Sequence, residues 1–138
     1  MAPDVVPSPA TGRERGSAVV DFALVGSLVT LLFVAVVQVA LVVHVRTTLV
    51  DCAAEGARWG ARAGRTPDEG AARARDLVAS ELSRSYATRL GDGVRARRQD
   101  RAGVAVVEVT IRAPIPLVAL LGPSGGLTVS GHAFDESQ

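Results

Sequence analysis

Residues 22–45 read FALVGSLVTLLFVAVVQVALVVHV, a run of 24 residues without Asp, Glu, Lys or Arg. An α-helix of this length extends about 36 Å, whereas the hydrocarbon core of a bilayer is about 30 Å thick. Ser27, Thr30 and Gln38 interrupt the run only mildly, because hydroxyls can bond back to helix carbonyls and a Gln is tolerated where helices pack together. A buried core helix has a shorter apolar run, of about 10 to 14 residues. The segment therefore predicts one transmembrane helix.

Two kinds of cleavable export signal, the secretory signal and the lipoprotein signal, also contain an apolar run. A secretory signal has an apolar region of about 7 to 15 residues that ends at a small-residue cleavage site, and the run here is longer. A lipoprotein signal would place the only cysteine, Cys52, after the apolar run, but Asp51 stands where a small uncharged residue is needed. We therefore interpret Cys52 as a small packed residue.

The rest of the chain divides where its composition changes. Residues 1–16 contain three Pro and scattered charges without a periodic apolar pattern, which is typical of a short flexible leader. A helical pattern without Pro then continues past the apolar run, so we expect one long helix over residues 17–64, with its transmembrane part at about 22–45. Residues 65–138 are expected to form a small external α+β domain.

Start and stop signals organise this external domain. Thr66 is placed as the N-cap of a second helix, with Pro67 at the first helical position and Glu69 three residues after the cap. Apolar residues recur at helical spacing as far as Tyr86, and Gly91–Gly93 ends the run. This helix is amphipathic and should lie against another element.

Strand-like residues follow the second helix. We expect strands over residues 94–98, 104–113 and 127–133, with residues 99–103 as a hairpin loop. In the middle strand, apolar residues alternate with polar ones, which predicts one buried and one wet face; the polar positions are Glu108, Thr110 and Arg112. The fold class is therefore α+β: a long N-terminal transmembrane helix that continues outside, then an amphipathic helix and a small antiparallel sheet of about three strands.

Small residues recur every four positions in the second half of the long helix. They form two adjoining rows on the helix surface, and small residues let another backbone approach closely, so these rows can pack against the chain's own C-terminal part or against another subunit. Ala-rich filler near a helix end would show the same spacing. The candidate packing residues are Ala53, Ala57 and Ala61 in one row and Gly56, Gly60 and Gly64 in the other.

The residue inventory excludes several kinds of function. The chain has 15 basic and 14 acidic residues and a net charge of +1, so there is no strong electrostatic case for nucleic acid as the main partner. One cysteine excludes an intramolecular disulfide and a multi-cysteine metal site. His44 and His132 lie far apart in the sequence, and Ser124 lacks the flanks of a nucleophile elbow. We expect no catalytic residue, no metal ligand and no cofactor.

Four arginines near the hairpin, Arg95, Arg97, Arg98 and Arg101, form a basic cluster. Contact with lipid headgroups, nucleic acid or an acidic partner would use such a cluster, but a solvated edge strand has the same pattern. All 15 basic residues of the chain are Arg, which indicates a coding bias and weakens any argument from Arg alone. We interpret the cluster as a solvated edge strand.

A charged stretch that ends in glycine precedes the apolar run. After Arg13, Glu14 and Arg15 come Gly16 and Ser17, and the apolar segment then contains Asp21 followed by Phe22. A carboxylate in an apolar helix is costly, although less so near the helix end than at the bilayer centre, and it usually has a charged partner.

This arrangement resembles the N-terminus of type IV pilins and pseudopilins, in which a prepilin peptidase cuts after the glycine and an acidic residue followed by Phe stands fifth in the mature chain. Gly16, Ser17, Asp21 and Phe22 take those places, with Asp21 where Glu is more usual. The segment RGSAVVDFALV, the single apolar run and the motif EGAR at residues 55–58 resemble the TadE-like minor pilins of tight-adherence pilus systems. The closing PIPLVALLG and GGLTVSGHA segments resemble the same family.

The resemblance implies a pilin-like subunit, not an enzyme, that acts in assembly of a tight-adherence pilus or a related secretion apparatus. Its implied partners are the membrane, a prepilin peptidase, other pilin-like subunits and pilus platform proteins. The implied location is the cytoplasmic membrane, with residues 1–15 cytoplasmic and residues from about 46 outside. The alternative is an uncleaved single-pass protein that anchors an external domain in another cell-envelope complex.

Overall fold

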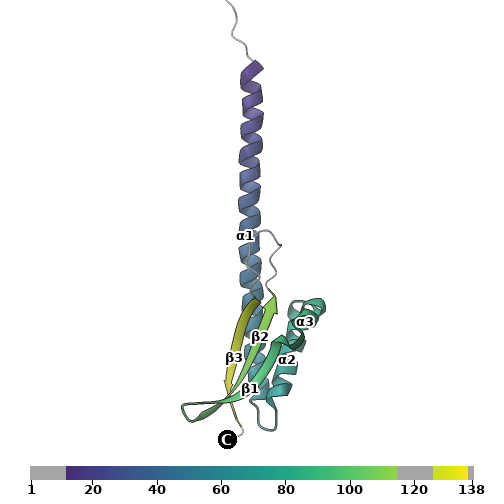
Figure 1. Cartoon of the computed structure of the whole chain (residues 1–138), viewed down its shortest axis with the longest axis vertical. Coiled ribbons are helices and arrows are strands. Elements are labelled where there is room, and N and C mark those ends of the chain that lie inside the picture. The colour runs from purple at the N-terminus through teal and green to yellow at the C-terminus, as the bar shows by residue number, and fades with distance from the viewer. Residues whose placement is uncertain (1–11, 115–125, 137–138) are drawn as a thin grey trace, which may run out of the picture. The chain divides into compact units, whose positions relative to one another are not determined.

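The computed structural model describes residues 12–114 and 126–136 (Figure 1). The expected α+β class is confirmed by a long helix, two shorter helices and a three-stranded antiparallel sheet. The chain divides into two units, residues 1–37 and 38–138. The elements in chain order are α1 (Gly12–Gly60), α2 (Pro67–Glu81), α3 (Arg84–Leu90), the 3-10 turn η1 (Gly91–Gly93), β1 (Val94–Arg101), β2 (Val104–Pro114) and β3 (Gly126–Phe134).

Helix α1 differs from the expected range at both ends. It begins at Gly12 instead of residue 17, because Arg and Glu are good helix formers and no Pro separates them from the apolar run. It ends at Gly60 instead of residue 64, because the following residues turn toward α2 and Gly64 has a φ of 78°, in the left-handed region that glycine adopts without strain. Residues 1–11 of the expected leader lie outside the described residues.

The start of α2 confirms the predicted cap. Thr66 Oγ1 accepts a hydrogen bond from the Glu69 backbone N–H at 3.2 Å, and Glu69 Oε2 accepts one from the Thr66 N–H at 2.8 Å. The expected single helix as far as Tyr86 is instead two helices, because the Ser83 hydroxyl accepts the Tyr86 N–H at 3.1 Å and caps a new helix, α3. The break directs Tyr86 toward the sheet, where its hydroxyl donates to the Pro114 carbonyl at 2.9 Å.

The three strands lie in the order β1-β2-β3. The first hairpin closes more tightly than expected, since residues 99–101 belong to β1 and the turn consists of Ala102 and Gly103, with φ values of 56° and 81°. Two consecutive positive φ values match the twist of the flanking strands. The expected third strand is confirmed as β3, whereas residues 115–125 of the closing motif lie outside the described residues.

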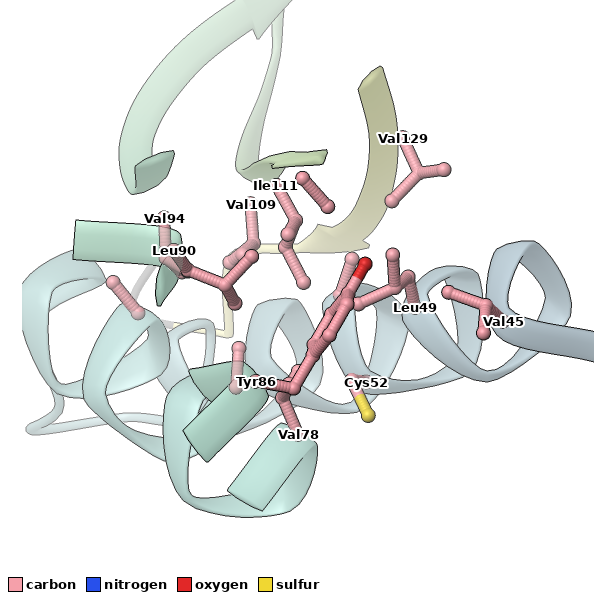
Figure 2. Close-up of a cluster of buried hydrophobic side chains, with 14 of the residues drawn as sticks. Val45, Leu49, Cys52, Val78, Tyr86, Leu90, Val94, Val109, Ile111 and Val129 are labelled. Atoms are coloured by element: carbon pink, nitrogen blue, oxygen red, sulfur yellow. The ribbon is translucent and has the colours of Figure 1, made fainter. Parts of the chain in front are cut away.

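The core of residues 38–138 lies between the sheet and the helices (Figure 2). The inward-facing residues of β2 are buried, as the alternation predicted, and Val109 and Ile111 join the core cluster that includes residues of α1 and α2. On the other face of β2, Glu108 was expected to be exposed to solvent but is buried, with 8% of its surface exposed. Neighbouring polar side chains on β1 and β3 cover it.

Candidate functional site

The surface of α1 between residues 19 and 43 is apolar and uncovered. Its large side chains are exposed; Phe22, for example, is 80% exposed and Phe33 is 67% exposed. Within the described residues, α1 is the one helix long and apolar enough to cross a membrane. Its most apolar stretch of 18 residues has a mean hydropathy of 2.7, and 6% of this stretch is buried. A core helix of a water-soluble domain would be mostly buried, so this surface indicates a membrane anchor.

The hydroxyl side chains of Ser27 and Thr30 are satisfied within the helix, whereas Gln38 Oε1 has no hydrogen-bond partner among the described residues. Ser27 Oγ donates to the Ala23 carbonyl at 2.7 Å, and Thr30 Oγ1 donates to the Gly26 carbonyl at 2.8 Å. The predicted back-bonding of these hydroxyls is confirmed. In hydrocarbon an unsatisfied polar group costs several kcal/mol, so both residues are compatible with a lipid-facing helix.

The candidate cleavage and assembly residues lie on the N-terminal part of α1. Gly16 is helical, and a Cβ added there would meet no described atom within 4 Å. Ser17, Asp21 and Phe22 are exposed, and Ser17 and Asp21 lie on the same helix face because they are four residues apart. Among residues whose side chains are described, none forms an ion pair with Asp21. The Asp21 carboxylate can therefore pair with a cationic group that does not belong to these residues.

The rows of small residues on α1 face the chain's own domain. Ala53, Ala57 and Ala61 are buried. On the second row, a Cβ added to Gly56 would lie 2.7 Å from the Gly70 carbonyl oxygen, and one added to Gly60 would lie 3.1 Å from the Thr66 carbonyl oxygen. Helix α2 thus lies against the glycine row. Gly64 stands apart from this contact, with nothing within 4 Å of its added Cβ.

A second close contact on α1 involves Gly131 of β3, which the sequence analysis did not single out. A Cβ on Gly131 would lie 2.5 Å from Ala54 Cα and closer still to Ala54 N and Ala53 C. The available signal was a glycine inside a strand pattern, which often marks close backbone approach. Helix α1 is thus in backbone contact with α2 through one set of small residues and with β3 through another.

Two of the four arginines in the basic cluster on β1 are paired with carboxylates. Arg97 Nη2 lies 2.9 Å from Glu108 Oε2, and Arg98 pairs with Asp135. His132 Nε2 lies 3.2 Å from Glu108 Oε1, and the same nitrogen lies 3.2 Å from Arg101 Nη2. These contacts balance the charges of Arg97 and Arg98 locally.

The environment of Glu108 has opposing effects on its pKa. Burial acts to raise the pKa of this carboxyl, but the hydrogen bond and charge of Arg97, together with His132, outweigh burial and leave the pKa below its usual value. Glu108 is therefore held as a carboxylate beneath the cluster.

Cys52 is a packed side chain of the core, 3% exposed. Burial, followed by the negative charges of Glu81 and Asp51, raises the pKa of its thiol to about 11. A protonated, buried thiol is a poor nucleophile, so the interpretation of Cys52 as a packed residue is confirmed.

Residues 16–58 match the family model described as TadE-like protein. This segment is TadE-like. The match begins at Gly16 and ends at Arg58, the last residue of the EGAR motif, and thus includes Ser17, Asp21 and the whole apolar run. Comparison with curated proteins and with solved structures gives no match. The TadE-like segment and its single apolar helix indicate a membrane protein related to the tight-adherence pilus.

Proposed function

We propose that this TadE-like chain is a membrane-anchored pilin-like subunit that acts, without catalytic activity of its own, in assembly of a tight-adherence pilus or a related secretion apparatus. The observation that carries the proposal is the uncovered apolar surface of α1 within the segment that matches the family. Its partners are a prepilin peptidase, other pilin-like subunits and platform proteins. The N-terminus is cytoplasmic and the α+β domain is external; a reporter fused at Gln138 should therefore be active outside, and activity only in the cytoplasm would contradict this orientation.

The proposed cleavage site is the peptide bond between Gly16 and Ser17. This bond lies within α1, which starts at Gly12, so a peptidase must first open the end of the helix. Opening a helix end is inexpensive, because terminal turns lack part of their hydrogen bonds and fray readily. Glycine next to the bond lowers the cost further.

Cleavage is tested by measuring the intact mass of the chain from a host that contains prepilin peptidase. The wild type should lose residues 1–16, and Gly16→Leu should keep them. The matched control is Gly26→Leu, because Gly26 is also helical with nothing within 4 Å of an added Cβ; it should be cleaved normally. A full-length wild type in the presence of the peptidase would favour the uncleaved membrane anchor instead.

The proposed role of Asp21 is to pair with a positive group during assembly. Cleavage would create an ammonium group at Ser17, four residues away on the same face, and a neighbouring subunit would offer the same group. An unpaired charge buried by subunit packing costs about 3 to 5 kcal/mol, so pairing would select one axial register.

Asp21→Ala should therefore remain in the membrane and be cleaved, yet lose co-purification with other pilin-like subunits. Asp21→Glu should be tolerated. Asp51→Ala is the control, since Asp51 is an exposed carboxylate on the same helix beyond the apolar run. Normal co-purification of Asp21→Ala would refute the pairing role.

A further inference from the structure

A hollow of about 340 Å³ lies on the outer face of the sheet, at the start of β1. Arg95 lies directly opposite Thr110 in the ladder, and Arg112 is two residues further along β2 on the same face. Diagonal neighbours of this kind lie within reach of long side chains. The hollow is lined by Gly93, Arg95, Ala96, Arg97, Thr110 and Arg112.

The charges around this hollow are not balanced. Arg97 is paired with Glu108, whereas neither Arg95 nor Arg112 joins an ion pair within residues 16–114 and 126–136. Arg95 Nε donates to the Asp92 carbonyl at 3.3 Å. Two exposed arginines and Thr110 therefore line the same hollow, a donor set that suits the oxygens of a phosphate.

The hollow lies at the end of the sheet where α1 leaves its apolar run. Gly131 of β3 lies against Ala53 and Ala54, and five residues later the Glu136 N–H donates to the Ala61 carbonyl at 2.8 Å. Strand β3 therefore runs along α1 in the same direction, and its first residues lie level with earlier residues of α1.

The packing of the core agrees with this direction. Val129 of β3 and Val45, the last residue of the apolar run, belong to the same buried cluster (Figure 2). Thr128, beside Val129, is directly opposite Arg112. Val45 ends the apolar run, so a headgroup layer at Val45 would lie close to the level of Thr128 and of its partner in the sheet, Arg112.

We propose that this hollow binds the phosphate of an anionic phospholipid headgroup. Arg95 and Arg112 hold the phosphate oxygens, Thr110 adds a hydroxyl donor, and the bound lipid ties the sheet to the membrane surface. The inference rests on membrane anchoring and is independent of cleavage or of any pilus role. The apolar helix anchors the chain in the membrane, and residues 93–112 would add recognition of an anionic headgroup.

The test uses the full chain in nanodiscs of equal parts phosphatidylglycerol and phosphatidylcholine. Native mass spectrometry measures which lipid stays bound after the disc is stripped. The wild type should retain one phosphatidylglycerol in clear preference to phosphatidylcholine. Each basic residue near an anionic surface contributes a factor of about five in binding, so Arg95→Gln/Arg112→Gln should reduce the preference by about thirtyfold at most.

The matched control is Arg62→Gln/Arg73→Gln, which removes the same charge near Trp59, at the other end of the domain. It should keep the preference. An equal loss in the control would show a net-charge effect and overturn the site, as would an unchanged preference in Arg95→Gln/Arg112→Gln. Glycerol 3-phosphate, added at the concentration of phosphatidylglycerol, should not displace the lipid; displacement would assign the hollow to a soluble phosphate compound and overturn the lipid source.

Discussion

Replacing Gly131 with alanine should strongly destabilise the α+β domain. The new Cβ would lie 2.5 Å from Ala54 Cα and closer to two further backbone atoms of α1. These atoms belong to a hydrogen-bonded helix and cannot rotate away as a side chain can, so β3 and α1 must separate. Overpacking in a core lowers the free energy of unfolding by about 1 to 3 kcal/mol. We expect a loss at the upper end of this range, because the new Cβ is attached to the backbone of β3 and meets the backbone of α1. A loss of about 3 kcal/mol raises the unfolded fraction about a hundredfold.

The measurement is urea unfolding of the full chain in detergent, followed by the fluorescence of Trp59. The guanidinium carbons of Arg62 and of Arg73 on α2 lie 4.8 Å and 5.5 Å from its ring centroid, so the signal reports the packing of α2 on α1. Gly126→Ala is the control, because among the described residues its Cβ would meet just the Ala113 carbonyl oxygen, at an ordinary 3.5 Å. Equal urea midpoints for Gly131→Ala and the wild type would refute the close-contact argument.

Four further variants or treatments test other contacts. Gly70→Ala, whose Cβ would lie 2.6 Å from the Gly56 carbonyl oxygen, should lower the free energy of unfolding by about 1 to 3 kcal/mol; an unchanged urea midpoint would contradict the helix contact. Thr66→Ala should cost about 1 kcal/mol through loss of the cap and Thr66→Ser little, as judged by the same midpoints. Because the pKa of Glu108 is lowered in the folded state from its ordinary 4.5, its contribution is present above about pH 4.5 and lost as the pH falls through the folded pKa. Glu108→Gln should therefore flatten the acid limb of a stability against pH curve, and an identical limb would argue against the paired carboxylate. Cys52, with its thiol pKa raised to about 11, should resist maleimide at pH 8 until urea unfolds the chain, and rapid labelling of the folded chain would show that the thiol is accessible.

Local signals in the sequence predicted the elements well. The apolar run, the Thr66 cap and the alternation in β2 each act through residues close in the chain, so the helix, the start of α2 and the buried face of the sheet could be anticipated. The motif from Gly16 to Phe22 is also defined by spacing along the chain, and its role in cleavage and assembly stays a prediction. Element ends were less accurate: the Ser83 cap and the tight Ala102–Gly103 turn moved two boundaries, since short caps and turns compete with longer periodic patterns.

The sequence by itself determined that α1 is apolar on every side over 24 residues, because a run without a formal charge leaves no charged face to expose to water. It left open what the small residues of α1 contact, since spacing shows that a close approach is possible but not which backbone makes it. Only the tertiary structure placed Gly70 and Gly131 against them, buried Glu108 beneath Arg97, and brought Arg95 and Arg112 to one hollow without an ion pair to any described residue. These features depend on strand register and on the direction in which β3 follows α1, which are set by packing between residues far apart in the chain.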